Sequence, residues 1–107
     1  MCVARQEIFG PVANLFAVDA LEEAIDVMNA SPYGNAATIY TSSGKHARDF
    51  RHGVRAGNIG INVGVAAPMA YFPFGGMKDS FFGDLHPQSR DAIRFFTESK
   101  VVITRWP

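Results

Sequence analysis

The sequence has a single cysteine, no excess of charge of either sign and no long apolar run, and each absence excludes a class of protein. One cysteine, Cys2, cannot build an internal disulfide framework, which excludes the small secreted folds held by disulfides. Ten basic and ten acidic side chains cancel, so no overall field attracts nucleic acid or an anionic membrane. The apolar runs are too short to span a bilayer, and no secretory signal pattern opens the chain. We therefore expect a soluble, intracellular protein, cytoplasmic or in the mitochondrial matrix of a eukaryote, without nucleic-acid or membrane partners.

The composition is that of a globular domain, but the aromatic residues are unevenly distributed. Of 107 residues, 48% are hydrophobic and 19% are charged, which is too apolar for a disordered tail and sufficient for one small domain or part of one. The last third of the chain holds most of the rings: Tyr71, Phe72, Phe74, Phe81, Phe82, Phe95, Phe96 and Trp106. This concentration predicts an apolar face that contacts another protein segment.

Strand and helix patterns alternate over residues 12–63. Nearly apolar runs at 12–18 and 36–41 predict strands covered on both faces, and the alternation in 58–63 predicts a third. Apolar residues spaced as on one helix face follow Asp19, which offers an N-cap with Glu22 as its capping-box partner: Leu21, Ala24, Ile25 and Met28. A second helix is expected over about 44–52, capped by Ser42 or Ser43, with an inner face of Ala47, Phe50 and Val54. The alternation predicts an α/β fold with an open, mostly parallel sheet and flanking helices.

Residues 64–85 interrupt this alternation. They contain Gly and Pro at intervals and no helical or strand period, and a loop of this length inside a domain is usually functional. Pro87 suits the first turn of a third helix, with an inner face of Ala92, Ile93 and Phe96. A β-branched strand over 99–106 then closes the chain, and its free edge needs a partner.

The segment Gln6-Glu7-Ile8-Phe9-Gly10-Pro11-Val12 carries the strongest local pattern for binding. Glu7 and Phe9 lie two residues apart, so in extended chain both side chains point to one side. A carboxylate accepts hydrogen bonds from vicinal hydroxyls, and an aromatic plate beside it suits a ribose that carries a planar ring. From these residues alone, an ordinary loop with a solvated Glu and a core Phe is the favoured interpretation, since short motifs have many false matches.

Other polar groups have simpler explanations than catalysis. Gly75 to Lys78 lack the spacing and the Ser/Thr ending of a phosphate-binding loop, and no strand leads directly into them. Cys2 has no glycine nest or nearby base, and His46 and His52 are six apart, which is not the spacing of one helix face. His86 is expected to act as a cap or a satisfied loop group.

Taken together, four ordered motifs resemble the C-terminal part of an aldehyde dehydrogenase. They are the Glu-Ile-Phe-Gly-Pro segment at 7–11, the Asn-x-x-x-Tyr-Gly turn at 29–34, the Gly-x-x-x-Ile-Asn strand at 57–62 and Pro-Phe-Gly-Gly-x-Lys-x-Ser at 73–80. The family usually continues with Gly-x-Gly-Arg-Glu, where this chain has Phe-Phe-Gly-Asp-Leu-His at 81–86. That departure, and the ending from Phe95 to Trp106, resemble the methylmalonate-semialdehyde dehydrogenase branch of the family.

The resemblance implies a fold and a function for the complete enzyme. Residues 1–98 would be the C-terminal portion of the catalytic domain, and residues 99–107 an oligomerisation strand that makes a homo-oligomer through 99–106. Glu7 would hydrogen-bond the nicotinamide ribose of NAD and Phe9 would pack near the nicotinamide ring, while loop 64–85 would approach the aldehyde. The implied reaction is NAD-dependent oxidation of a malonate- or methylmalonate-type semialdehyde through a cysteine thioester, which coenzyme A takes up with loss of the carboxylate carbon.

The same resemblance implies that this chain alone is inactive. The family's nucleophilic cysteine, general base and dinucleotide-binding segment precede the motif at 7–11, and only six residues precede it here. Cys2 does not match the nucleophile's motif, so we assign no catalytic or metal-binding residue. The chain is therefore expected to be a fragment of a CoA-acylating semialdehyde dehydrogenase. The alternative is a stand-alone, non-catalytic interaction module that self-associates through 99–106.

Overall fold

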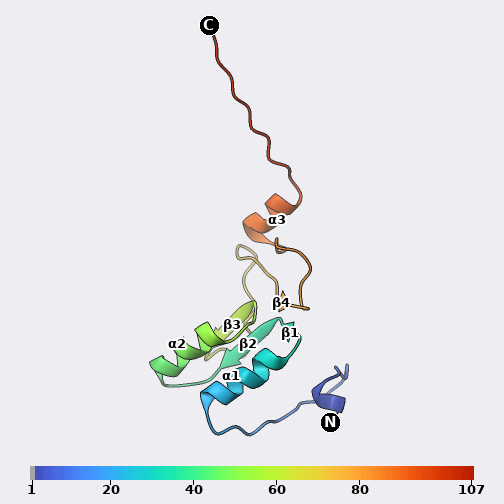
Figure 1. Ribbon diagram of the computed structural model, residues 1–107, viewed down its shortest axis with the longest axis vertical. Coiled ribbons are helices and arrows are strands. Elements are labelled where there is room, and N and C mark those ends of the chain that lie inside the picture. The colour runs from blue at the N-terminus through green and yellow to red at the C-terminus, as the bar shows by residue number, and fades with distance from the viewer. Residues whose placement is uncertain (1) are drawn as a thin grey trace.

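A two-stranded parallel sheet forms the centre of the protein (Figure 1). The computed structural model describes residues 2–107. In it, β2 (Ala36–Ile39) pairs in parallel with β3 (Asn58–Ile61), and the register places Ala37 opposite Ile59. The helix α2 (Gly44–Gly53) is the crossover between them, as parallel strands require. The predicted strands over 36–41 and 58–63 and their parallel pairing are confirmed, although each strand ends two residues earlier than expected.

The core is small and lies between this sheet and the two helices α1 (Leu21–Ala30) and α2. Its buried residues come from β2, from α2 and from the segment before β3: Ala37, Phe50, Val54 and Ala56. Apolar side chains of α1 and of both strands pack against it while only partly buried: Leu21, Ile25, Met28, Ile39 and Ile59. Both predicted helices are thus confirmed, and so are the apolar faces that they turn to the core.

The N-cap of α2 is one of the two serines predicted from the sequence, whereas the N-cap of α1 differs from the prediction. Ser43 Oγ accepts the backbone N–H of His46 at 3.2 Å and caps α2, as predicted. The predicted pairing of Asp19 with Glu22 at the start of α1 is wrong. Ala20 occupies the N-cap position, and the Asp19 N–H donates instead to Glu23 Oε2 at 3.1 Å. Because the helix begins one residue later than a cap at Asp19 would require, the carboxylate that reaches back is Glu23.

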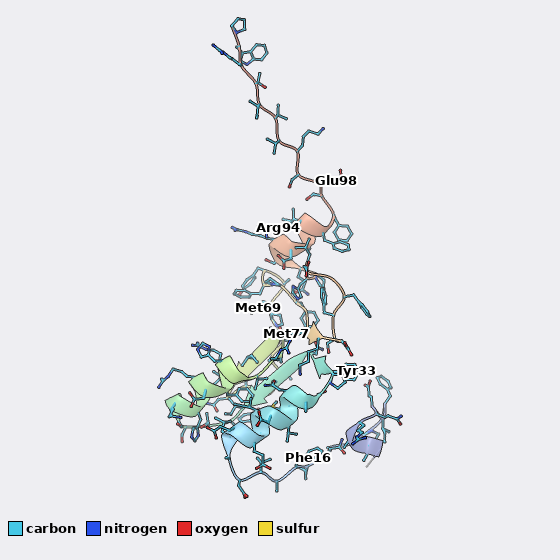
Figure 2. All side chains as sticks on the ribbon, viewed as in Figure 1. Phe16, Tyr33, Met69, Met77, Arg94 and Glu98 are labelled. Carbon is cyan, nitrogen blue, oxygen red and sulfur yellow. The ribbon has the colours of Figure 1, made fainter. Side chains whose placement is uncertain are left out.

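A second, antiparallel pair of strands joins the turn after α1 to the long segment 64–85. Here β1 (Tyr33–Gly34) pairs with β4 (Met77–Lys78), with Tyr33 opposite Lys78. Figure 2 labels Tyr33 and Met77 at this junction. The sequence did not predict this pairing, because two-residue strands leave no period to read. The rest of segment 64–85 is irregular, as expected.

Two segments expected to be regular and buried are exposed. Residues 12–18 form no strand, and Leu15 within them is 98% exposed. The third helix, α3 (Ser89–Phe95), starts after Gln88 rather than at Pro87. Its expected inner face is not buried, since Ile93 is 65% and Phe96 82% exposed. A strand needs a second strand to pair with, and an apolar helix face needs an apolar surface to pack on. The described residues supply neither for 12–18 or for α3.

The ends of the chain extend away from the core. A short 3₁₀ turn, η1 (Cys2–Ala4), lies at the N-terminal end. Residues 97–107 leave α3 as an isolated extended segment, so the strand expected at 99–106 is not formed within this chain (Figures 1 and 2). The resulting shape measures 73 × 34 × 22 Å, with a radius of gyration of 18.9 Å, against about 13 Å for a compact domain of 100 residues.

Among residues 2–107, no helix combines the length and the apolar character needed to cross a bilayer.

Candidate functional site

Glu7 and Phe9 lie on one exposed hollow at the N-terminal end of the chain. The hollow has a volume of about 610 Å³ and is lined by Val3, Gln6, Glu7, Ile8, Phe9, Gly10, Val12 and Asn14. Within the described residues the Glu7 carboxylate makes no hydrogen bond or ion pair, and the Phe9 side chain is fully exposed. Two local bonds brace the segment: Asn14 Nδ2 donates to the Val3 carbonyl at 3.1 Å, and the Val12 N–H donates to the Gly10 carbonyl at 2.8 Å. A free acceptor and a free ring are therefore presented together.

A second hollow places Glu7 opposite the turn that follows α1. Its volume is about 980 Å³. One wall comes from the N-terminal segment, including Arg5 and Glu7, and the other from Ser31 to Tyr33 with Asn35 and Ser80. Three of the four motifs that resemble the aldehyde dehydrogenases thus contribute residues to one concave region, although they are distant in the sequence.

Hydrogen bonds hold the second wall in place. Ser80 Oγ accepts the Gly34 N–H at 3.0 Å, and the Asp79 N–H donates to the Pro32 carbonyl at 3.0 Å. These bonds reinforce the β1–β4 pairing, so the motif at 73–80 is joined to the turn at 29–34 by side chain and backbone.

Lys78 makes the most concentrated set of contacts at this junction. Its Nζ lies 3.4, 3.1, 2.9 and 3.4 Å from the carbonyl oxygens of Met28, Asn29, Ser31 and Tyr33. These carbonyls belong to the last residues of α1, to the turn that follows it and to the first residue of β1. The Lys78 ammonium is therefore engaged by the protein itself, which supports the sequence-based rejection of a phosphate-binding loop at 75–78.

The side chains of Asn29 and Asn58 join segments that are distant in the sequence. Asn29 Nδ2 donates to the Gly53 carbonyl at 2.8 Å and its Oδ1 accepts the Arg55 N–H at 2.8 Å, which joins the end of α1 to the end of α2. Asn58 Nδ2 donates to the carbonyls of Asn35 at 3.1 Å and Gly75 at 2.9 Å. The backbones at Gly57 and Gly75 approach so closely that a Cβ on Gly57 would overlap the Gly75 carbonyl.

His86 lies against the turn that contains Gly75. Its ring stacks on Phe81 with centroids 4.4 Å apart, and its Nδ1 lies 3.5 Å from Asp91 Oδ2. A Cβ on Gly75 would overlap the imidazole. His86 is thus a partnered loop group, one of the two roles that the sequence predicted; the cap of α3 is Gln88.

A pair of charged groups with shifted pKa values lies outside these hollows, on the surface of α2. Lys45 Nζ lies 2.7 Å from Asp49 Oδ2, and this hydrogen bond lowers the pKa of Asp49 and raises the pKa of Lys45. Among residues 2–107, no three His, Cys, Asp or Glu side chains are grouped to hold a metal ion.

The sequence predicted a binding role for Glu7 and Phe9, which the structure places on one hollow, and it did not predict the contacts of Lys78, Asn29 and Asn58. All three stand inside the motifs at 29–34, 57–62 and 73–80, which is the signal that could have identified them. Their contacts are with backbone atoms distant in the sequence, and no local spacing encodes such contacts.

The comparisons with known proteins agree with the motifs. The model of the aldehyde dehydrogenase family matches residues 1–102. A malonate-semialdehyde dehydrogenase of Geobacillus kaustophilus is 48% identical over 106 residues, which are 99% of this chain and 22% of that protein.

Solved structures give the same result. A methylmalonate-semialdehyde dehydrogenase from Oceanimonas doudoroffii superposes with a TM-score of 0.92 at 45% identity, over 96% of this chain and 21% of its own. A structure from Sinorhizobium meliloti, described as such a dehydrogenase complexed with NAD, gives 0.93 at 43% identity, with the same two coverages. The chain spans about a fifth of the length of these relatives, and with a family model matched over nearly all its residues it belongs to the aldehyde dehydrogenase family.

Proposed function

We propose that this chain is the C-terminal part of the catalytic domain of an NAD-dependent, CoA-acylating malonate- or methylmalonate-semialdehyde dehydrogenase, and that Glu7 contacts the nicotinamide ribose. The observation that carries the proposal is the unpartnered Glu7 carboxylate beside the exposed Phe9 ring on one hollow. The relatives' names support a semialdehyde dehydrogenase reaction, and one of these relatives was solved with NAD.

The donor set on this hollow fits the cofactor. NAD when bound supplies the hydride acceptor. The two oxygens of Glu7 can accept hydrogen bonds from the vicinal hydroxyls of a ribose, and charge-assisted bonds of this kind are the stronger ones. The Phe9 ring offers a flat apolar surface for the nicotinamide, while Gly10 and Pro11 give the segment a short, stiff turn. The role of these residues is to orient the cofactor, and no proton transfer is assigned to them.

Three exposed apolar segments support the proposal that this chain is part of a larger catalytic domain. Residues 12–18 and 99–106 form no strand within the described chain, and Ile93 and Phe96 on α3 are mostly exposed. In the complete enzyme, the remainder of the catalytic domain would cover residues 12–18 and the exposed face of α3, and a second subunit would pair with 99–106 to form a homo-oligomer. Residues 1–98 and 99–107 would then be the domain portion and the oligomerisation strand, and loop 64–85 would approach the semialdehyde. Coenzyme A as co-substrate and a cytoplasmic location complete the proposal.

The relatives named above are all dehydrogenases, so the alternative of a stand-alone interaction module has no support from them. The 107 residues alone are expected to be inactive, and detectable NAD reduction by the purified chain with semialdehyde and CoA would contradict this part of the proposal.

The test is the substitution Glu7→Gln in the full-length enzyme that carries this chain. Loss of the charged acceptor is expected to weaken NAD binding by about 10- to 100-fold or to lower the rate of hydride transfer by a similar factor. Glu22→Gln, the same chemical change on the exposed surface of α1, is the matched control and should leave both unchanged. Unchanged NAD kinetics in Glu7→Gln would exclude the assignment.

A further inference from the structure

The Lys78 ammonium is surrounded as a bound monovalent cation would be. The four carbonyl oxygens around its Nζ lie within a narrow range of 2.9–3.4 Å. An ammonium has three N–H donors, so four oxygens at such similar distances form a shell around a positive charge rather than a set of individually directed bonds. The side chain is partly buried, which reduces the competition of water for those oxygens.

The position of this shell explains why a cation belongs there. The last carbonyls of a helix have no intrahelical partner, and the helix dipole concentrates negative charge on them. The last turn of α1 contains no basic residue of its own. Lys78 supplies the missing positive charge from a segment almost fifty residues further along the chain.

The backbone of Lys78 adopts an unfavourable conformation in this position. Its φ is +56°, in the left-handed region that residues other than Gly, Asn and Asp seldom occupy. Lys78 also pairs with Tyr33 in the β1–β4 ladder, so its backbone and its ammonium both hold the same turn. The contacts of the ammonium therefore offset a conformational cost at the point where loop 64–85 meets α1.

We propose that the carbonyls of Met28, Asn29, Ser31 and Tyr33 form a monovalent-cation site, which the tethered ammonium of Lys78 occupies. Through this site the charge of Lys78 fixes β4 and the following Ser80 against the turn after α1. Lys78 is thus a positioning residue, and shortening its side chain exposes a site for a free small cation such as K⁺ or NH₄⁺. This inference does not depend on the identity of the reaction.

The experiment is cation rescue of Lys78→Ala in the full-length protein that carries this chain. Hydrogen–deuterium exchange is measured for peptides that cover residues 28–35 and 76–81. In tetramethylammonium chloride, whose cation is too large for the shell, we expect exchange about tenfold or more faster than in the parent. In KCl or NH₄Cl of equal concentration, exchange should return toward the parent rate. Equal exchange in all three salts would overturn the proposal.

Lys78→Met is the matched control, because its side chain is of similar length and carries no charge. It should exchange as fast as Lys78→Ala in tetramethylammonium chloride, but its side chain blocks the site, so K⁺ should not rescue it. If Lys78→Ala does not fold in any of the three salts, the exchange rate of Lys78→Met alone tests the proposal. Parent-like protection in Lys78→Met would show that charge is not needed and would overturn the proposal; exchange faster by tenfold would support it.

Discussion

The side-chain amide of Asn62 bonds to both polar backbone groups of Thr41. Its Oδ1 accepts the Thr41 N–H at 2.8 Å, and its Nδ2 donates to the Thr41 carbonyl at 3.0 Å. The Asn62 N–H also donates to the Ile39 carbonyl at 2.8 Å. The amide thus continues the parallel ladder of β2 and β3 beyond Ile61, with a side chain in place of a strand.

Asn62→Ala should therefore destabilise the end of the sheet. Two hydrogen bonds are lost, and alanine is disfavoured at the φ of +57° that asparagine tolerates. We expect a decrease of about 1–3 kcal/mol in the free energy of unfolding, measured by urea denaturation. Asn62→Gly keeps the backbone conformation and loses the amide, so the difference between the two variants isolates the conformational cost. Parent-like stability in both would show that the amide contributes nothing.

Phe50 is the most deeply buried residue of the core, with 3% of its surface exposed. Phe50→Ala should lower the free energy of unfolding by about 3–5 kcal/mol, because it removes a ring and leaves a cavity. In a core this small, such a loss should convert much of the protein to the unfolded state at 37 °C. Phe96→Ala is the control, since Phe96 is 82% exposed in this chain. An equal effect of both substitutions in the isolated chain would contradict the described core.

Gly57 is required by the close approach of two backbone segments. A Cβ at this position would overlap the Gly75 carbonyl, which is backbone and cannot rotate away. Gly57→Ala should therefore separate Gly75 from Asn58 and increase proteolysis within 64–85. Gly44→Ala places the same methyl group at the start of α2, where the nearest atom is 3.7 Å away, and should be neutral or slightly stabilising. Similar protease sensitivity in both variants would argue against the contact.

The Lys45–Asp49 pair gives a predicted pH dependence on α2. Its hydrogen bond lowers the pKa of Asp49, so its stabilising effect is present above the ordinary carboxyl pKa and is lost as the pH falls through the lowered value. The pKa of Lys45 is raised, so the upper limit of the effect lies at strongly alkaline pH. Asp49→Asn should melt slightly below the parent at neutral pH and together with it once the pH lies below the lowered pKa of Asp49. Because both groups are exposed, 0.5 M salt should reduce the difference. A difference that grows in acid would contradict this assignment.

Local sequence patterns predicted the elements whose capping, packing and strand-pairing partners lie within this chain. The helix α2 could be predicted because Ser43 caps it and Phe50 lies on one apolar face, and β2 and β3 because each has the other as its partner. Residues 12–18 and 99–106 have equally strong strand patterns, yet neither is a strand here. Hydrogen bonds between strands join residues that are distant in the sequence, and these two segments pair with no strand among the described residues.

The same distinction applies to the candidate site. Glu7 and Phe9 lie two residues apart, and their role was predicted from this spacing together with the resemblance of the motif at 7–11. The contacts of Lys78 with the end of α1 depend on the β1–β4 pairing, which brings together residues almost fifty positions apart. Such a contact follows from the tertiary arrangement, and only the motif around Lys78 marks its position in the sequence.

We propose that these residues are part of a semialdehyde dehydrogenase, and the mass of the native protein tests this proposal. An antibody against residues 84–107 would isolate the protein from its host for intact-mass measurement, followed by an assay of NAD reduction with malonate semialdehyde and CoA. Because the chain matches 22% of a relative's length, we predict a mass between four and five times 11.7 kDa and CoA-dependent NAD reduction. A native product of 11.7 kDa, or a larger protein that does not reduce NAD with this substrate, would contradict the account.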